Sequence, residues 1–147
     1  NVLNAVLSAA YTEYYKAQTD YSRRQHLRDI AVMEMLFATG ARVSEICSLT
    51  PATMDLSNHT VKIFGKGSKE RIIQIENPDV LKILSDYFAA FADDIEKTGS
   101  IFMSPIFKLC KCRKTSQPLC HYIIKNVAVK VKMNVEDNLD SDIFYDF

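Results

Sequence analysis

Two cationic residues, an arginine after a helix end and a lysine at a hairpin tip, are of the types that could bind one phosphate group from two sides. Arg42 follows a predicted helix that ends at Gly40, and Lys66 lies between Gly65 and Gly67 at the tip of an expected hairpin. A guanidinium can donate two parallel hydrogen bonds to one phosphate, and an ammonium on a glycine-flanked tip can approach the same phosphate from another side. Together these residues predict half of a site for phosphoryl-transfer chemistry.

The hydrophobic pattern predicts the elements that would carry these two side chains. Helical spacing of apolar residues predicts five helices, at residues 1–17, 27–38, 43–49, 77–99 and from about residue 116 onward. A period of two predicts strands at residues 54–56, 60–64 and 71–75, the last two paired as a hairpin through residues 65–69. We therefore expect an α+β fold, mostly helical, with a small three-stranded antiparallel sheet.

Length and charge limit the organisation and the partners. The chain has 147 residues, enough for one sizeable core, and no apolar run long enough to span a bilayer, so we expect a cytoplasmic domain without a membrane partner. Its 18 basic and 18 acidic residues balance, but five acids and no base lie in residues 134–147. Residues 1–133 therefore hold 18 bases against 13 acids, a surplus that favours a nucleic-acid partner.

Basic residues gather around the expected hairpin. Lys62, Lys69 and Arg71 flank Lys66 along the chain. Their spacing fits contacts to phosphates that position a duplex without reading its sequence. A second basic cluster, at residues 108–114, is expected in a loop. Runs of charge are commonly solvated surfaces, and that alternative stays open for both clusters.

Two motifs extend these observations. Residues 39–46 read Thr-Gly-Ala-Arg-Val-Ser-Glu-Ile, and residues 65–71 read Gly-Lys-Gly-Ser-Lys-Glu-Arg. From about residue 27 to about residue 132 the chain resembles the catalytic domain of tyrosine recombinases, the phage integrase family, whose signature contains both strings. The resemblance implies site-specific DNA recombination or integration by a phage or mobile element. In that chemistry a tyrosine attacks a DNA phosphodiester and forms a 3′-phosphotyrosine intermediate without a metal or other cofactor.

The resemblance gives roles to three residues. Arg42 would clamp a non-bridging phosphate oxygen, Glu45 would steady that arginine, and Lys66 would protonate the departing 5′-oxygen. The residues alone allow other interpretations. Arg42 and Glu45 are three apart and fit an exposed ion pair on one helix face, and Lys66 fits a solubilising lysine at a turn.

The other half of the family's site is not found in this sequence. No His-x-x-Arg string occurs, and Tyr145, the one tyrosine late enough to be considered, follows no matching motif. No nucleophile is therefore assigned. We expect residues 1–133 to be a partial catalytic domain that ends before these motifs, and residues 134–147 to be an acidic tail outside the family pattern. We expect this chain alone to be inactive.

Partners and rival interpretations follow from the same residues. The resemblance implies duplex DNA as the partner and a tetramer as the family's working assembly, with this fragment a monomer or dimer. One rival is a catalytically silent DNA-binding remnant; another is a protein-interaction domain in which residues 108–114 meet an acidic partner. A zinc site is the metal alternative, and its ligands would be Cys110, Cys112, Cys120 and His121. Their spacing is not that of a standard zinc finger, so no metal is expected.

Overall fold

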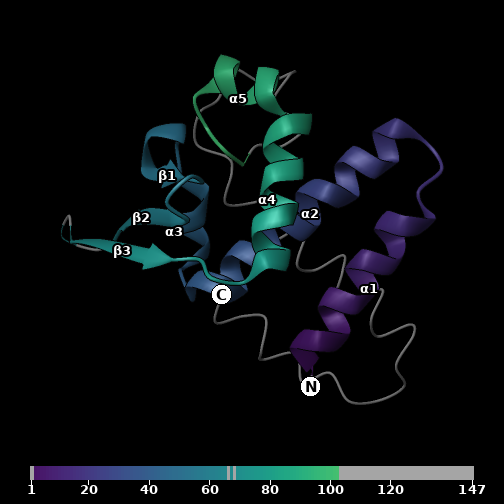
Figure 1. Ribbon diagram of the computed structural model, residues 1–147, viewed down its shortest axis with the longest axis horizontal. Helices are drawn as coiled ribbons and strands as arrows, with labels where there is room; N and C mark the ends of the chain where they lie inside the picture. The colour runs from purple at the N-terminus through teal and green to yellow at the C-terminus, as the bar shows by residue number, and fades with distance from the viewer. Residues whose placement is uncertain (1, 66, 68, 103–147) are drawn as a thin grey trace.

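A central helix organises the part of the chain that the computed structural model describes, which is residues 2–65, 67 and 69–102. This helix, α2 (Asp20–Thr39), packs against α1 (Val2–Lys16) and against α4 (Pro78–Ala90). Figure 1 shows the strands at the far side of α2 and α4 from α1. A short helix, α3 (Val43–Cys47), follows α2 and contacts both it and the sheet.

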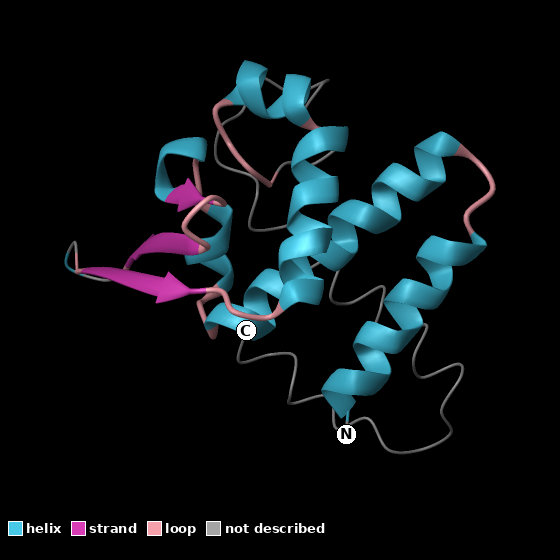
Figure 2. Cartoon of the chain, in the orientation of Figure 1, coloured by secondary structure: helices cyan, strands magenta, loops and turns pink. Residues whose placement is uncertain are grey.

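The sheet has three antiparallel strands in the order β1-β2-β3 (Figure 2). They are β1 (Met54–Asp55), β2 (Thr60–Phe64) and β3 (Glu70–Gln74), and β1 is preceded by one 3-10 turn, η1 (Pro51–Thr53). In the β2–β3 register, Val61 lies opposite Ile73 and Ile63 lies opposite Arg71. The expected α+β class, mostly helical with a small antiparallel sheet, is confirmed.

The core lies where α2, α4 and the inner face of the sheet meet. Every residue of α2 from Ile30 to Leu36 is buried, as are Val61 and Ile63 of β2. Tyr87 of α4 is completely buried, and its hydroxyl donates a hydrogen bond of 2.6 Å to the carbonyl oxygen of Ile101. Because a buried phenol needs a partner, this bond also fixes the segment after α5 (Ala92–Thr98) against the core.

Helix α2 begins earlier than its apolar pattern predicts. The polar residues 19–22, which the pattern treats as a break, form the cap and first turn of the helix. Thr19 Oγ1 accepts a hydrogen bond of 3.1 Å from the Ser22 amide, and Asp20 lies in the first turn, where a carboxylate favours the positive end of the helix dipole. Capping and solvent exposure, rather than burial, therefore account for these first residues.

The expected single helix over residues 77–99 is two helices. The chain breaks at Phe91, which has φ −114° and ψ 17°, between α4 and α5. Arg24 of α2 supports the break: its Nη2 donates to the Ala90 carbonyl and to Asp94, both at 3.1 Å, and its guanidinium lies 4.5 Å from the Phe91 ring centroid. A side chain remote in sequence satisfies a helix-end carbonyl here, so periodicity could not predict the break.

Several sequence-based expectations fall on residues 103–147 and lie outside the described residues. They are the helix from about residue 116, the basic loop at residues 108–114, the zinc alternative, Tyr145 and the acidic tail. Within the described part of the chain, each helix is either too short or too polar to cross a lipid bilayer.

Candidate nucleic-acid interface

Arg42 sits at the N-cap of α3, directly after the turn that ends α2. Gly40 takes the left-handed conformation, with φ 61°, and its amide donates to the Leu36 carbonyl at 3.0 Å. Thr39 Oγ1 donates to the Met35 carbonyl at 2.6 Å and accepts from the Ala41 amide at 3.2 Å. The Thr-Gly-Ala-Arg turn is thus closed by its own threonine and glycine. The same turn leaves Arg42 exposed at a helix N-terminus.

Glu45 collects three donors from two parts of the chain. Its Oε2 accepts from the Arg42 backbone amide at 2.8 Å, which places a carboxylate on an otherwise unpaired amide at the start of α3. It also accepts a two-point fork from Arg71 of β3, with Nη1 at 3.2 Å from Oε1 and Nη2 at 2.8 Å from Oε2. Glu45 therefore links α3 to the hairpin.

The environment of Glu45 keeps its carboxylate ionised. The hydrogen bonds from Arg71 are the largest cause that lowers the pKa of Glu45 below its ordinary value; burial opposes them, and the Arg42 amide lowers the pKa further. The same pair raises the pKa of Arg71. The sequence predicted that Glu45 would steady Arg42 or pair with its side chain. The ion pair is instead with Arg71, and the contact with Arg42 is to the backbone amide.

The hairpin between β2 and β3 closes next to this ion pair. The Gly65 amide donates to the Lys69 carbonyl at 2.8 Å, and Gly67 takes a positive φ of 73°, a conformation that glycine adopts without strain. A Cβ atom at Gly65 would lie 3.4 Å from both Arg71 Nη1 and Glu45 Oε1, so the strand passes in contact with the ion pair. Lys66 itself lies outside the described residues.

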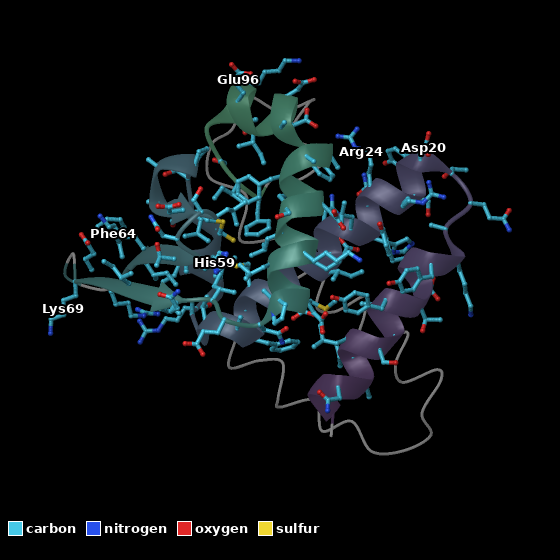
Figure 3. The ribbon with its side chains drawn as sticks, viewed as in Figure 1. Asp20, Arg24, His59, Phe64, Lys69 and Glu96 are labelled. Carbon is cyan, nitrogen blue, oxygen red and sulfur yellow. The ribbon has the colours of Figure 1, made fainter. Side chains whose placement is uncertain are left out.

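The other basic residues of the hairpin do not share one face. Lys62 is paired across the strands with Ile72, on the opposite face from Arg71, and forms an exposed ion pair of 3.3 Å with Glu70. Lys69 is exposed near the tip (Figure 3). Figure 3 shows Lys69 and Phe64 on opposite sides of the hairpin ribbon. The structure therefore brings Arg71 toward the Arg42 corner, but not Lys62.

Sequence reasoning missed the pairing of Glu45 with Arg71. The two residues are 26 positions apart, and Glu45 already has a cationic neighbour at helical spacing in Arg42. A signal did exist in the strand pattern. Arg71 lies opposite the buried Ile63, so strict alternation places both side chains on the same face of the sheet, and strand β2 is in contact with α3.

Comparison with known proteins decides the family. Residues 9–141 match the model of the phage integrase family. The chain belongs to this family. Its described fold agrees with that assignment, since a crystal structure of XerA recombinase superimposes on 97% of the chain with a TM-score of 0.66, at 19% sequence identity, and this match covers 44% of the XerA chain.

Relatives of this phage integrase family chain carry the tyrosine recombinase name. A tyrosine recombinase of Agathobacter rectalis is 41% identical over 103 residues, covering 70% of this chain and 34% of the relative. The tyrosine recombinases XerC of Chlamydia pneumoniae and XerD of Vibrio cholerae are 40% identical over 73 residues and 43% identical over 67 residues. These matches cover 50% and 46% of this chain, and 23% and 22% of the relatives. The chain thus spans about a third or less of these relatives.

Proposed function

We propose that this chain is the part of a site-specific DNA recombinase that holds one side of the scissile phosphate. Arg42 is the phosphate clamp, Lys66 is the hairpin acid for the departing 5′-oxygen, and Glu45 fixes the corner from which Arg42 projects. Duplex DNA is the partner, and no nucleophile is assigned. Residues 1–133 form the partial catalytic domain, and residues 134–147 are an acidic tail, into which the family match extends as far as residue 141.

The cationic residues of this half-site act on the phosphate through electrostatic stabilisation of its charge. Attack on a phosphodiester builds negative charge on the non-bridging oxygens, and preorganised cationic donors stabilise that charge. The guanidinium of Arg42 has the planar shape for two hydrogen bonds to one phosphate, whereas a lysine ammonium can both neutralise a phosphate and transfer a proton. The two residue types therefore suit different tasks, one for holding charge and one for protonating the leaving oxygen.

The placement of Arg42 is the observation that carries this proposal. Arg42 is exposed at the N-cap of α3, its amide is held by Glu45 at 2.8 Å, and the same carboxylate is joined to the strand that follows the hairpin. The family assignment supports the chemistry, since the relatives named above are tyrosine recombinases.

Duplex binding can be tested through its dependence on salt. We expect the chain to bind a labelled duplex with little sequence preference, and log Kd to rise with log salt concentration by roughly 0.9 for each phosphate contacted. Lys69→Ala should reduce this slope by about one unit, because it removes one exposed phosphate contact. Glu96→Ala, an exposed change on α5 remote from the hairpin, is the control. Binding that is independent of salt would contradict the proposal.

The expected lack of catalysis is tested separately by covalent trapping. On a nicked duplex that traps the phosphotyrosine intermediate, we expect no protein–DNA adduct from this chain, since it has no assigned nucleophile and no second arginine in a His-x-x-Arg string. Loss of even one charge-stabilising donor typically costs about 10²- to 10³-fold in rate. An adduct that disappears in Tyr145→Phe would show the assignment of the tail to be wrong.

A further inference from the structure

The fork between Arg71 and Glu45 joins the two elements of the half-site. Glu45 belongs to α3, one turn from Arg42, and Arg71 belongs to β3, immediately after the hairpin. Both terminal nitrogens of the guanidinium are used, at 3.2 Å and 2.8 Å, so the fork fixes the direction of the arginine as well as its distance. Within the part of the chain that the structure describes, this ion pair connects the hairpin to α3.

Burial makes this pair different from an ordinary surface ion pair. The Glu45 side chain is 8% exposed, whereas that of Arg71 is 43% exposed. A carboxylate removed from water depends on its protein donors, and here two of its three described donors come from the arginine. The Lys62–Glu70 pair instead joins β2 to β3 on the other face of the sheet, and both of its side chains are 43% exposed, so water can replace either partner.

Gly65 shows how closely the hairpin is seated on the pair. Its backbone passes so near that a Cβ atom would stand 3.4 Å from one atom of each partner, Arg71 Nη1 and Glu45 Oε1. Its amide also closes the hairpin onto Lys69. If Arg71 moved away from Glu45, the backbone at Gly65 would therefore lose one of the two side chains against which it packs.

We propose that Arg71 is a positioning residue, which holds the β2–β3 hairpin against the N-terminus of α3, rather than a direct contact to a DNA phosphate. This inference rests on the proposed function, in which Arg42 and the hairpin meet the same DNA backbone. Since the guanidinium is committed to Glu45, Arg71 sets the separation between Arg42 and the hairpin. Arg42 and the hairpin are then held at a fixed separation before DNA binds, so no conformational entropy is lost in bringing them together on binding.

The first test measures duplex affinity and its salt slope for Arg71→Ala and Arg71→Lys. We expect both variants to bind about tenfold more weakly than the parent chain, with the parent's salt slope, because the phosphate contacts remain but must be ordered on binding. Lysine keeps the charge but cannot reproduce the fork, so it should not rescue affinity. Glu70→Gln, which breaks the exposed pair on the other face without removing a basic residue, is the control and should change the affinity by less than about twofold.

A direct phosphate contact predicts the reverse pattern. Arg71→Lys would then bind like the parent chain, and Arg71→Ala would lose about 0.9 from the slope. That result would overturn the proposal. Thermal unfolding of each variant should accompany these measurements, and the lysine variant is used alone if the alanine variant does not fold.

The second test needs no DNA and separates this inference from the proposed function. In Arg71→Lys, amide hydrogen exchange at Gly65 and Arg42 should become about tenfold faster, while exchange at Gly40, which caps α2, should be unchanged. Lys62→Ala should leave the Gly65 amide as in the parent chain. Unchanged exchange at Gly65 in Arg71→Lys would overturn the positioning role. Failure of the parent chain to bind DNA in a salt-dependent way would contradict only the proposed function.

Discussion

Glu34 and Glu45 are buried almost equally, with 9% and 8% of each residue exposed, yet their surroundings act on them in opposite directions. Glu34 of α2 accepts a hydrogen bond of 2.9 Å from the neutral Tyr11 hydroxyl of α1, and burial raises its pKa. Glu45 accepts the Arg71 fork, which lowers its pKa. Burial therefore sets the direction at Glu34, where the hydrogen bond from neutral Tyr11 lowers the pKa only in part, whereas at Glu45 the charged fork from Arg71 outweighs burial.

This comparison also separates a packing contact from a contact of the half-site. Tyr11 and Glu34 join α1 to α2, and the pKa of Tyr11 is itself raised, mainly by burial and then by its bond to Glu34. Glu45 and Arg71 join α3 to the hairpin at the end of the molecule where Arg42 is exposed. The two glutamates thus provide two sites for substitution, one at the contact of α1 with α2 and one where α3 meets the hairpin.

Duplex affinity should show the largest contrast between the two glutamates. Glu45→Gln and Glu34→Gln each remove one negative charge at equal burial, so a general electrostatic effect would change both in the same way. We expect Glu45→Gln to bind DNA about tenfold more weakly, because the hairpin loses its charged anchor, and Glu34→Gln to differ by less than about twofold. Titration of a labelled duplex measures both. Equal affinities in the two variants would break the comparison.

Stability should depend on pH with opposite sign at the two sites. The depressed pKa of Glu45 means that its contribution is present above its ordinary value of 4.5 and is lost as pH falls through the folded-state value. The raised pKa of Glu34 means that ionising it costs stability, fully so once pH exceeds its folded-state value, and that the cost is absent below 4.5.

Urea unfolding of the two glutamine variants should reveal these signs. At pH 7 we expect Glu34→Gln to raise the free energy of unfolding, and this gain should vanish as pH falls below the ordinary carboxyl pKa of 4.5. Glu45→Gln should instead lower the free energy of unfolding at pH 7, and its difference from the parent chain should shrink on acidification. A gain from Glu45→Gln at pH 7 would contradict the assigned cause of its lowered pKa.

The smallest effects should come from the uncharged and the exposed partners. Tyr11→Phe removes the donor to Glu34 and should lower the free energy of unfolding by about 1 kcal/mol. Lys62→Ala breaks an ion pair with both side chains 43% exposed and should change it by less than about 0.5 kcal/mol. Urea unfolding at pH 7 measures the free energy of unfolding of both variants and shows which loss is larger. A larger loss from Lys62→Ala would mean that the outer face of the hairpin is not a simple solvated surface.

Local signals predicted much of the fold, including the position of Arg42 directly after the turn that ends α2. The strand alternation predicted all three strands of the sheet, and Gly40 predicted the end of α2. The errors occurred where a distant side chain replaced a local partner. Arg24 supports the break at Phe91 by donating a hydrogen bond to the carbonyl oxygen of Ala90, which is 66 positions away along the chain. No periodic pattern contains that contact. The start of α2 was missed because its first turn is stabilised by capping instead of burial.

The sequence by itself determined the motifs, the helix and strand periods, and the family, because these depend on residue types at short and fixed spacing. Only the tertiary structure decided which cation Glu45 would hold. Arg42 is three residues away and Arg71 is 26, but α3 and β3 meet in space, and the buried carboxylate takes the fork that reaches it. The physical reason is that burial removes water as a partner, so the choice falls to whichever donors the packed elements bring within hydrogen-bonding distance.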